Sequence, residues 1–388
     1  MDIDNNSLVK FIIGSHSIKY DVLNELMADI HPSDYRMGVM LVDAHSIFGK
    51  LYHDRKIAGI YEGSAPEMVR DIVVGFMNVL AHYRRYMSTR MRLDNDIYVM
   101  FNRIPPVYNR LCYDRFNEER ISRYDMTDPT YGFTSKVLEV AWDFILGLSP
   151  FFEGIYCLDN SGIDDYALMS RLGLLISRLE STDDMLVMVL STNVYGTQLI
   201  RKNWIQIHPK RDRSYLIDLE HCYSRGVLRS AKYRVSDKLT PEMLPLLWSI
   251  TGCESVSVPS LGIMSTKALL QTMDQMAADG NLTRNTSIAG FLENLLPYVS
   301  SHRVELKMAK SSIEERYKAL SARLSGLAIT SDQLARITAQ IYDVYDQNKL
   351  EQLNEILVQG RLDPEILHLE DLNLSMGMRE DYDVDIWE

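Results

Sequence analysis

The amino-acid sequence predicts an α/β fold in which helices flank a parallel sheet. Residues 37–43, MGVMLVD, form a short apolar run that ends in one carboxylate, which is typical of a fully buried strand. Two further apolar runs, 96–102 and 185–191, have the same character. Because segments with a helical spacing of apolar residues separate these runs, we expect a right-handed, doubly wound parallel sheet.

Local patterns predict the other elements of this sheet. Residues 66–80 begin with Pro and Glu, which a helix start tolerates, and continue with apolar residues. Residues 135–148 place Val, Ala, Phe and Ile on one side of an amphipathic helix. A short strand is expected at 155–157, and the paired Asp of residues 161–165 opens a helix that runs to residue 179, where acids at a helix start can simply cap it.

The carboxylate of Asp43 lies at the expected carboxyl end of the first strand. In open α/β sheets the loops that leave several strands converge at this end, outside the core, and chemistry collects there. Asp43 is therefore the first candidate site residue.

Composition favours an ordinary globular chain in the cytoplasm of the cell that makes it. The 388 residues are 46% hydrophobic and 24% charged. The chain has no apolar run of membrane-spanning length, and its first residues lack the features of a signal peptide. The four cysteines are widely separated, which predicts reduced thiols and no zinc framework.

Charge is distributed unevenly along the chain. The net charge is −12, and residues 305–388 carry 9 Lys and Arg against 17 Asp and Glu, so most of the acidity is C-terminal. Residues 84–123 carry 9 Arg against 5 acids, and residues 201–234 carry 9 Lys and Arg against 3 acids. Aromatic residues interleave both stretches, which permits a basic surface on an acidic protein, although residues 103–128 are interpreted first as a solvated surface helix.

Several motifs occur in the order found in one family. They are the Leu-Val-Asp strand, an Arg-rich segment, an Asp-Asp helix start, an apolar strand that ends in Ser with Gln-Leu soon after, and a helical region introduced by Thr240-Pro241-Glu242. Together, over residues 37–300, they resemble the 5′-nuclease family: the flap endonucleases and 5′–3′ exonucleases of phages and bacterial polymerases. This resemblance implies a PIN-like sheet and a phage-type member of the family.

The resemblance also implies a ring of carboxylates around two divalent metal ions, most of which this chain lacks. Asp43 matches the first family Asp, and Asp164 and Asp165 match the Asp-Asp pair. The other matched positions carry no acid: Asn102, Gly162, Asn193, Tyr195, Cys253 and Val256. Three carboxylates could hold at most one weak Mg²⁺ or Mn²⁺ ion, or they could simply cap helices and end a strand.

The family's duplex-gripping turn is altered as well. The resemblance places a Gly-Ile-Gly turn at residues 262–264, where this chain has Gly262-Ile263-Met264 followed by Ser265-Thr266-Lys267. Met enters a positive-φ turn less readily than Gly, although Lys267 or the helix start could still meet a phosphate. The resemblance and the charge pattern together give these candidate nucleic-acid-binding residues: Arg103, Arg110, Arg115, Arg120, Arg123, Arg201, Lys202, Lys210, Arg211 and Lys267.

The expected domain organisation follows the family match. An N-terminal extension (1–36) precedes a PIN-like core (37–235) with an arch region at about 103–128. A helix–turn–helix region (236–302), a C-terminal extension (303–375) and an acidic tail (376–388) complete the chain. Two helices are expected between residues 303 and 360, the second starting at Ser331.

The leading functional hypothesis is a catalytically degenerate 5′-nuclease that works by binding. Its partner would be branched or single-stranded DNA, or a replication or repair protein held by the C-terminal helices or the acidic tail. The alternative is a slow or context-activated metal-dependent nuclease whose missing ligands come from Glu153, Asp159 or Glu254. A third hypothesis is a structural subunit of a viral assembly. None of the three requires a membrane.

Overall fold

A computed structural model describes most of the central part of the chain. The described residues are 37–57, 65–90, 94–104, 106–118, 132–149, 152, 154–179, 185–208, 215–217 and 238–342. The expected N-terminal extension and acidic tail lie outside these ranges. None of the described helices is both long and apolar enough to span a bilayer.

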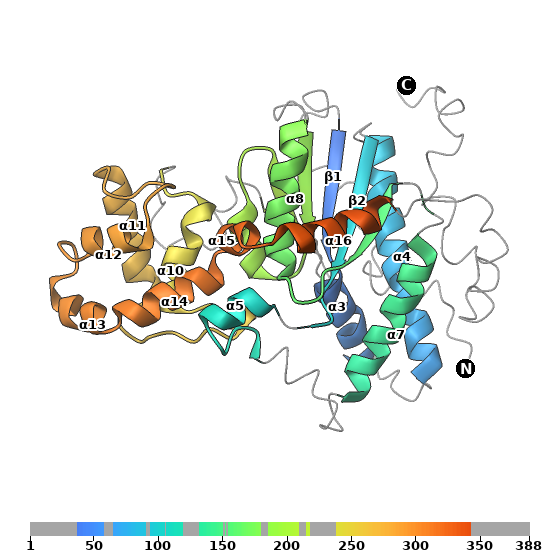
Figure 1. Ribbon diagram of the computed structural model, residues 1–388, viewed down its shortest axis with the longest axis horizontal. Coiled ribbons are helices and arrows are strands. Elements are labelled where there is room, and N and C mark those ends of the chain that lie inside the picture. Colours follow the sequence, from blue (N-terminus) through green and yellow to red (C-terminus); the bar gives the residue numbers. More distant parts are fainter. Residues whose placement is uncertain are drawn as a thin grey trace.

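A sheet of six strands forms the centre of the structure (Figure 1). Its strands are β1 (Met37–Asp43), β2 (Asp94–Phe101), β3 (Ile155–Asp159), β4 (Met185–Leu190), β5 (Trp204–His208) and β6 (Tyr215–Ile217). The strand order is β3-β2-β1-β4-β5-β6, in which the first five strands are parallel and β6 pairs antiparallel with β5. The predicted doubly wound parallel sheet is confirmed, whereas β5 and β6 were not expected from sequence.

Helices cover both faces of this sheet. On one face, Met40 and Val42 of β1 pack in a core with α3 (Ala44–Ile57), α4 (Ala65–Arg90) and α7 (Gly132–Leu148). On the other face, Val39 and Leu41 pack with α8 (Asp165–Leu179) and the helices that follow β5. Because successive side chains of β1 enter opposite cores, the strand needs apolar residues throughout, as its sequence has.

A group of short helices extends the second core away from the sheet, on the left of Figure 1. The 3₁₀ helix η4 (Pro241–Met243) leads into α10 (Leu244–Thr251), and α11 (Thr266–Ala278) and α12 (Ile288–Leu295) follow. Side-chain hydroxyls cap two of these helices: Ser265 accepts from Ala268 N, and Ser287 accepts from Gly290 N. The helical region expected after residue 240 is confirmed.

The C-terminal helices are more numerous than expected. Residues 303–342 form α13 (Arg303–Met308), α14 (Lys310–Leu320), α15 (Ala322–Leu327) and α16 (Ser331–Tyr342), so the expectation of two helices is wrong for this part. Ser321 explains one break, because its extended backbone ends α14 and its hydroxyl accepts from Leu324 N to start α15. The predicted start of the last helix at Ser331 is confirmed, while its predicted end lies outside the described residues.

Helix α16 reaches the edge of the sheet at β3. The side-chain amide of Gln340 accepts from the N–H of Asp159 (2.8 Å) and donates to its carbonyl (3.3 Å), in place of a neighbouring strand. In Figure 1 α16 runs from the short helices toward this edge. An otherwise open strand edge is thereby covered.

Candidate functional site

Strands β1 and β4 lie side by side, and the chain leaves them toward opposite faces of the sheet. After β1 it enters α3, whose buried residues belong to the first core, and after β4 it enters the 3₁₀ helix η3 (Val194–Leu199), which belongs to the second core. Such a switch point opens a crevice at the carboxyl ends of the strands. Asp43 ends β1 and Ser191 follows β4 at this point, as the sequence predicted for Asp43.

The carboxylate of Asp43 is buried and accepts three hydrogen bonds from the protein. Its Oδ2 accepts from the hydroxyls of Tyr166 (2.5 Å) and Ser191 (3.1 Å), and its Oδ1 accepts from Ser46 N (3.0 Å). The residue is 2% exposed. An ionised carboxylate offers about four acceptor positions, so most of those of Asp43 are used within the fold.

Tyr166 is the principal donor to Asp43. Burial, and then the adjacent negative charge of Asp43, raise the pKa of the Tyr166 phenol well above its ordinary value. The phenol therefore stays protonated, and its O–H donates a hydrogen bond to the carboxylate. Its oxygen also lies 2.7 Å from the hydroxyl of Ser191, which links β1, β4 and the first turn of α8 in one network.

Asn102, at the second family carboxylate position, holds the end of β2 to the loop before α8. Its Oδ1 accepts from Ile104 N (3.0 Å) and Gly162 N (3.2 Å), and its Nδ2 donates to Ile163 O (2.7 Å). A carboxylate can accept but cannot make the donation to Ile163. Both the oxygen and the NH₂ group of the Asn102 side chain are therefore needed for these hydrogen bonds.

Asp164 and Asp165 have structural partners at the start of α8. Asp164 Oδ1 accepts from Ala167 N (2.9 Å), which is a helix cap, and Asp165 Oδ1 accepts from Asn160 Nδ2 (2.8 Å). Both acids are buried. Gly162, where the family has Glu, has φ +84°, a conformation that L-residues rarely adopt.

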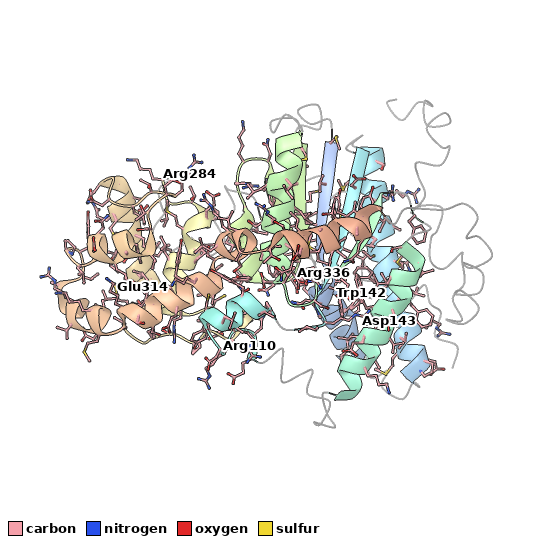
Figure 2. The ribbon with its side chains drawn as sticks, in the orientation of Figure 1. Arg110, Trp142, Asp143, Arg284, Glu314 and Arg336 are labelled. Atoms are coloured by element: carbon pink, nitrogen blue, oxygen red, sulfur yellow. The ribbon has the colours of Figure 1, made fainter. Side chains whose placement is uncertain are left out.

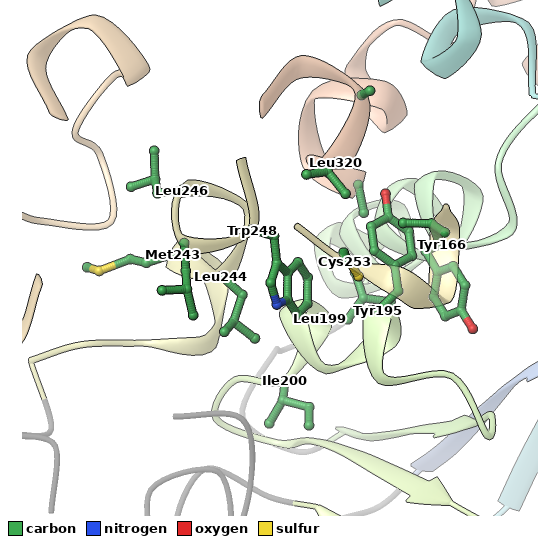
Figure 3. Packing of buried hydrophobic residues seen from close by; sticks show 14 of the residues in the cluster. Tyr166, Tyr195, Leu199, Ile200, Met243, Leu244, Leu246, Trp248, Cys253 and Leu320 are labelled. Carbon is green, nitrogen blue, oxygen red and sulfur yellow. The ribbon is translucent and has the colours of Figure 1, made fainter. Parts of the chain in front are cut away.

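Aromatic side chains occupy the region next to these acids. Tyr195, at another family carboxylate position, is fully buried, and its ring meets Tyr166 edge-on at 5.1 Å between centroids. Phe116 and Trp248 each lie 6.0 Å from the same ring. Figure 3 shows Trp248, Tyr195 and Tyr166 in a row above the sheet. We call these four residues the aromatic cluster.

The remaining family positions are apolar or capping residues. Asn193 Oδ1 accepts from Tyr195 N (2.9 Å) and caps η3, while Cys253 and Val256 are buried in the second core. Of the acids named as replacement ligands, Asp159 pairs with Arg103 (3.1 Å), and Glu254 is exposed. Glu153 lies outside the described residues.

No arrangement of His, Cys, Asp or Glu suited to a metal ion occurs within the described ranges, at the level of three or more side chains. Asp43, Asp164 and Asp165 belong to those ranges, and each accepts hydrogen bonds from the protein instead.

The candidate basic residues have different surroundings. Arg103 pairs with Asp143 and Asp159, and Arg201 lies over the ring of Trp204 (4.1 Å), where burial lowers the pKa of its guanidinium. The exposed members of the described set are Arg115, Lys202 and Lys267, with Arg110 half-buried. Arg120, Arg123, Lys210 and Arg211 lie outside the described residues.

The altered turn before α11 keeps its first glycine conformation. Gly262 has φ +69°, with no atom within 4 Å of the position a Cβ would take. Met264 is not among the non-glycine residues with positive φ, and its side chain is buried in the second core. Replacing the family's second Gly is therefore compatible with this turn, and Lys267 follows it, exposed in the first turn of α11.

Sequence reasoning missed the residues that satisfy the acids. Tyr166, Ser191 and Asn160 donate to Asp43 and Asp165; Ser191 belongs to a matched motif but was not assigned as a donor, and Tyr166 and Asn160 follow no motif. Their positions next to the motif acids were the available signal.

No family model and no curated protein sequence matches this chain. Solved structures match it in shape. A variant of the bacteriophage T5 flap endonuclease in a pseudo-enzyme–product complex with DNA and metal ions aligns with a TM-score of 0.54 and 12% identity, over 79% of this chain and 98% of that one. The T5 5′-exonuclease with bound zinc aligns with a TM-score of 0.56 and 14% identity, over 80% of this chain and all of the other.

The aligned share, 80% of 388 residues, is larger than the range 37–300 expected from the motifs, so the similarity takes in residues beyond that range. At 12–14% identity the similarity concerns the fold and not the chemistry. The chain has an α/β, PIN-like fold of the kind found in the T5 5′-nucleases.

Proposed function

We propose that this chain is a catalytically inactive 5′-nuclease-like protein that acts by binding branched or single-stranded DNA. The proposed inactivity rests on one observation: the three remaining acids all accept hydrogen bonds from the protein. Asp43 accepts from Tyr166, Ser191 and Ser46, and helix-start partners hold Asp164 and Asp165. The acids that the family match leaves therefore stabilise the fold.

Losing the metal ions has a large effect on phosphodiester hydrolysis. Two metal ions stabilise the attacking and the leaving oxygen, each contributing several kcal/mol to the transition state. Each ~1.4 kcal/mol is a factor of ten in rate, so loss of one side of this clamp slows cleavage by orders of magnitude. Three buried, partnered acids beside an aromatic cluster supply no such clamp.

Binding of DNA does not require these acids. Phosphates are held by Lys and Arg, and sequence-independent binding depends on how many phosphates they neutralise. Arg110, Arg115, Lys202 and Lys267 lie at or near the surface of the described part of the chain. Carboxylates withdrawn into hydrogen bonds and burial repel a DNA backbone less than an open acidic ring would.

The test has a cleavage arm and a binding arm. In the first, the purified chain is incubated with Mg²⁺ or Mn²⁺ and flap, gapped or single-stranded DNA, and no cleavage above background is expected. Metal-dependent cleavage that disappears in Asp43→Ala would refute inactivity and favour a slow nuclease.

In the binding arm, fluorescence anisotropy follows a labelled branched DNA at low and at physiological salt. We expect weak binding that falls steeply with salt and falls further when Arg110, Arg115, Arg120 and Arg123 are changed together to Glu. A matched control reverses four basic residues on the C-terminal helices, so that the net charge changes equally: Lys307, Lys310, Lys318 and Arg336 (Figure 2 labels Arg336).

The two quadruple variants separate a local contact from net charge. Equal losses in both would mean that only the overall charge matters, and the arginine segment would have no special role. Absence of binding at low salt would remove DNA as the ligand and leave a protein-binding or structural role in an assembly.

A further inference from the structure

The short helix α5 (Val107–Cys112) presents an unusually exposed apolar face. Ile104, Val107 and Leu111 are 55%, 52% and 81% exposed. Val107 and Leu111 are one helical turn apart and so lie on the same side, and Ile104 precedes the helix. We call these three residues the α5 patch.

The rest of the fold holds α5 firmly from its opposite side. Asn109, two residues from both Val107 and Leu111, is buried and donates from Nδ2 to Ala319 O (2.7 Å) and to Ser325 Oγ (3.1 Å). The N–H of Val107 donates to Gly162 O (2.9 Å). The apolar face is therefore fixed in place and directed outward, because its helix is attached to α14 and α15 behind it.

Positive charge lies next to the α5 patch. Arg110 is in the same helical turn, half-buried, with its Nε–H donated to Asp114 O (2.9 Å), and Figure 2 labels it on the outer side of α5. Arg115 follows three residues after the helix, is exposed, and pairs with Glu118 (3.1 Å). An apolar stripe beside two guanidinium groups fits a ligand that combines apolar side chains with carboxylates.

The chain itself contains such a ligand at its C-terminal end. Residues 381–388, DYDVDIWE, alternate acids at 381, 383 and 385 with apolar residues at 382, 384 and 386. An extended segment places alternate side chains on opposite sides, with about 6.6 Å between residues i and i+2. This spacing is close to the roughly 6 Å rise between residues i and i+4 of a helix, which separates Val107 from Leu111.

We propose that residues 381–388, called the tail segment below, bind the α5 patch of their own chain. The described structure ends at Tyr342, and the 38 residues between it and Asp381 amount to about 57 Å even at the 1.5 Å rise per residue of a helix, so chain length does not prevent the contact. Attachment to the same chain gives the tail segment an effective concentration on the order of millimolar, which a separate acidic peptide would have to match. The apolar side chains on one side of the segment cover the patch, and the long side chains of Arg110 and Arg115 reach around its edges to the acids on its other side.

Such binding would regulate the DNA contact, and this consequence rests on the proposed function. Carboxylates beside Arg110 and Arg115 compete with phosphates for the same guanidinium groups. The tail segment would therefore lower the affinity of the full chain for DNA.

Site-specific photo-crosslinking in the full chain tests the contact without DNA. The variant Leu111→p-benzoylphenylalanine places the crosslinker on the patch, at a position so exposed that folding is unaffected. The control, Met308→p-benzoylphenylalanine, lies on α13 at a side chain that is 83% exposed, which matches Leu111. After irradiation, mass spectrometry identifies the attached peptide, and the gel position separates crosslinks within one chain from crosslinks between two chains.

We expect crosslinks from position 111 to the tail segment within one chain, about tenfold more abundant than from position 308, because both positions share the same attachment and only the patch binds the segment. Changing Asp381, Asp383 and Asp385 together to Asn should reduce the yield severalfold. Equal yields from both positions, crosslinks only to other segments, no crosslink, or a crosslink to a second copy would each overturn the proposal.

A DNA titration of the Asn variant separates this proposal from the proposed function. If both hold, the variant binds branched DNA severalfold more tightly than the unmodified chain. If the crosslink forms but neither protein binds DNA, the contact stands and the proposed function fails. If DNA binds equally to both proteins, the regulatory consequence is refuted.

Discussion

Replacing each of two neighbouring buried tyrosines by Phe should have different effects on the free energy of unfolding. Tyr166 and Tyr195 are 2% and 0% exposed, and their rings touch. The Tyr166 hydroxyl donates to the carboxylate of Asp43, whereas the Tyr195 hydroxyl has no partner at full hydrogen-bond geometry in the described structure and has only Gln198 as a weak polar neighbour. Changing each to Phe removes one oxygen and leaves the ring in place.

The magnitudes follow from the partners. A hydrogen bond to a charged group contributes about 1.5–3 kcal/mol, so Tyr166→Phe should lower the free energy of unfolding by about 2 kcal/mol, with Ser191 and Ser46 still donating to Asp43. Tyr195→Phe removes a buried hydroxyl that has no partner at full hydrogen-bond geometry, so its effect should be near zero or stabilising by up to about 1 kcal/mol.

Urea unfolding measures both effects on the same protein. The midpoint should fall in Tyr166→Phe with an unchanged m-value, because the change alters stability and not the surface exposed on unfolding. Tyr195→Phe serves as the matched control for ring packing. Equal destabilisation by the two variants, or none by Tyr166→Phe, would show that the network around Asp43 does not stabilise the fold.

Three further outcomes can be checked. Gly252→Ala should destabilise by about 3 kcal/mol, because its Cβ would lie 2.5 Å from Ser260 N, whereas Gly280→Ala, also at positive φ but with open space, should cost only about 1 kcal/mol by thermal unfolding. Stability should fall with pH above about 10, where the unfolded chain loses phenolic protons that the two buried tyrosines retain, and the fall should be shallower when both are Phe. Gln340→Ala should speed amide hydrogen exchange at Asp159, which loses its acceptor.

The strand pattern was predictable because burial on two faces leaves a clear signal. Residues 37–43 and 185–190 face both cores and are apolar throughout, so their sequences alone identify buried strands. Strands β5 and β6 were missed because they are short and lie toward one edge, where pairing depends on neighbours that local sequence does not name.

The breaks between the C-terminal helices could not be predicted from the sequence. A helical spacing of apolar residues continues through residues 303–327, so periodicity cannot locate the breaks within it. Ser321 forms one break through its hydroxyl and extended backbone, and a serine at that spacing is ordinary within a helix. The motif acids were placed correctly along the chain, but their partners came from tertiary contacts, such as the one between Asp43 and Tyr166.

The hydrogen bonds of the Asn102 amide make a carboxylate unfavourable at this position. A single change to Asp would remove one of the two side-chain donors to Ile163 O, leaving Asn160, and would add a negative charge to a buried loop. Gly162 would require a side chain at φ +84°, and Tyr195 would require a charge in a filled aromatic cluster. Each single change toward an acid is unfavourable while the other positions keep their present contacts, so a ring of carboxylates at these positions would require several coordinated substitutions.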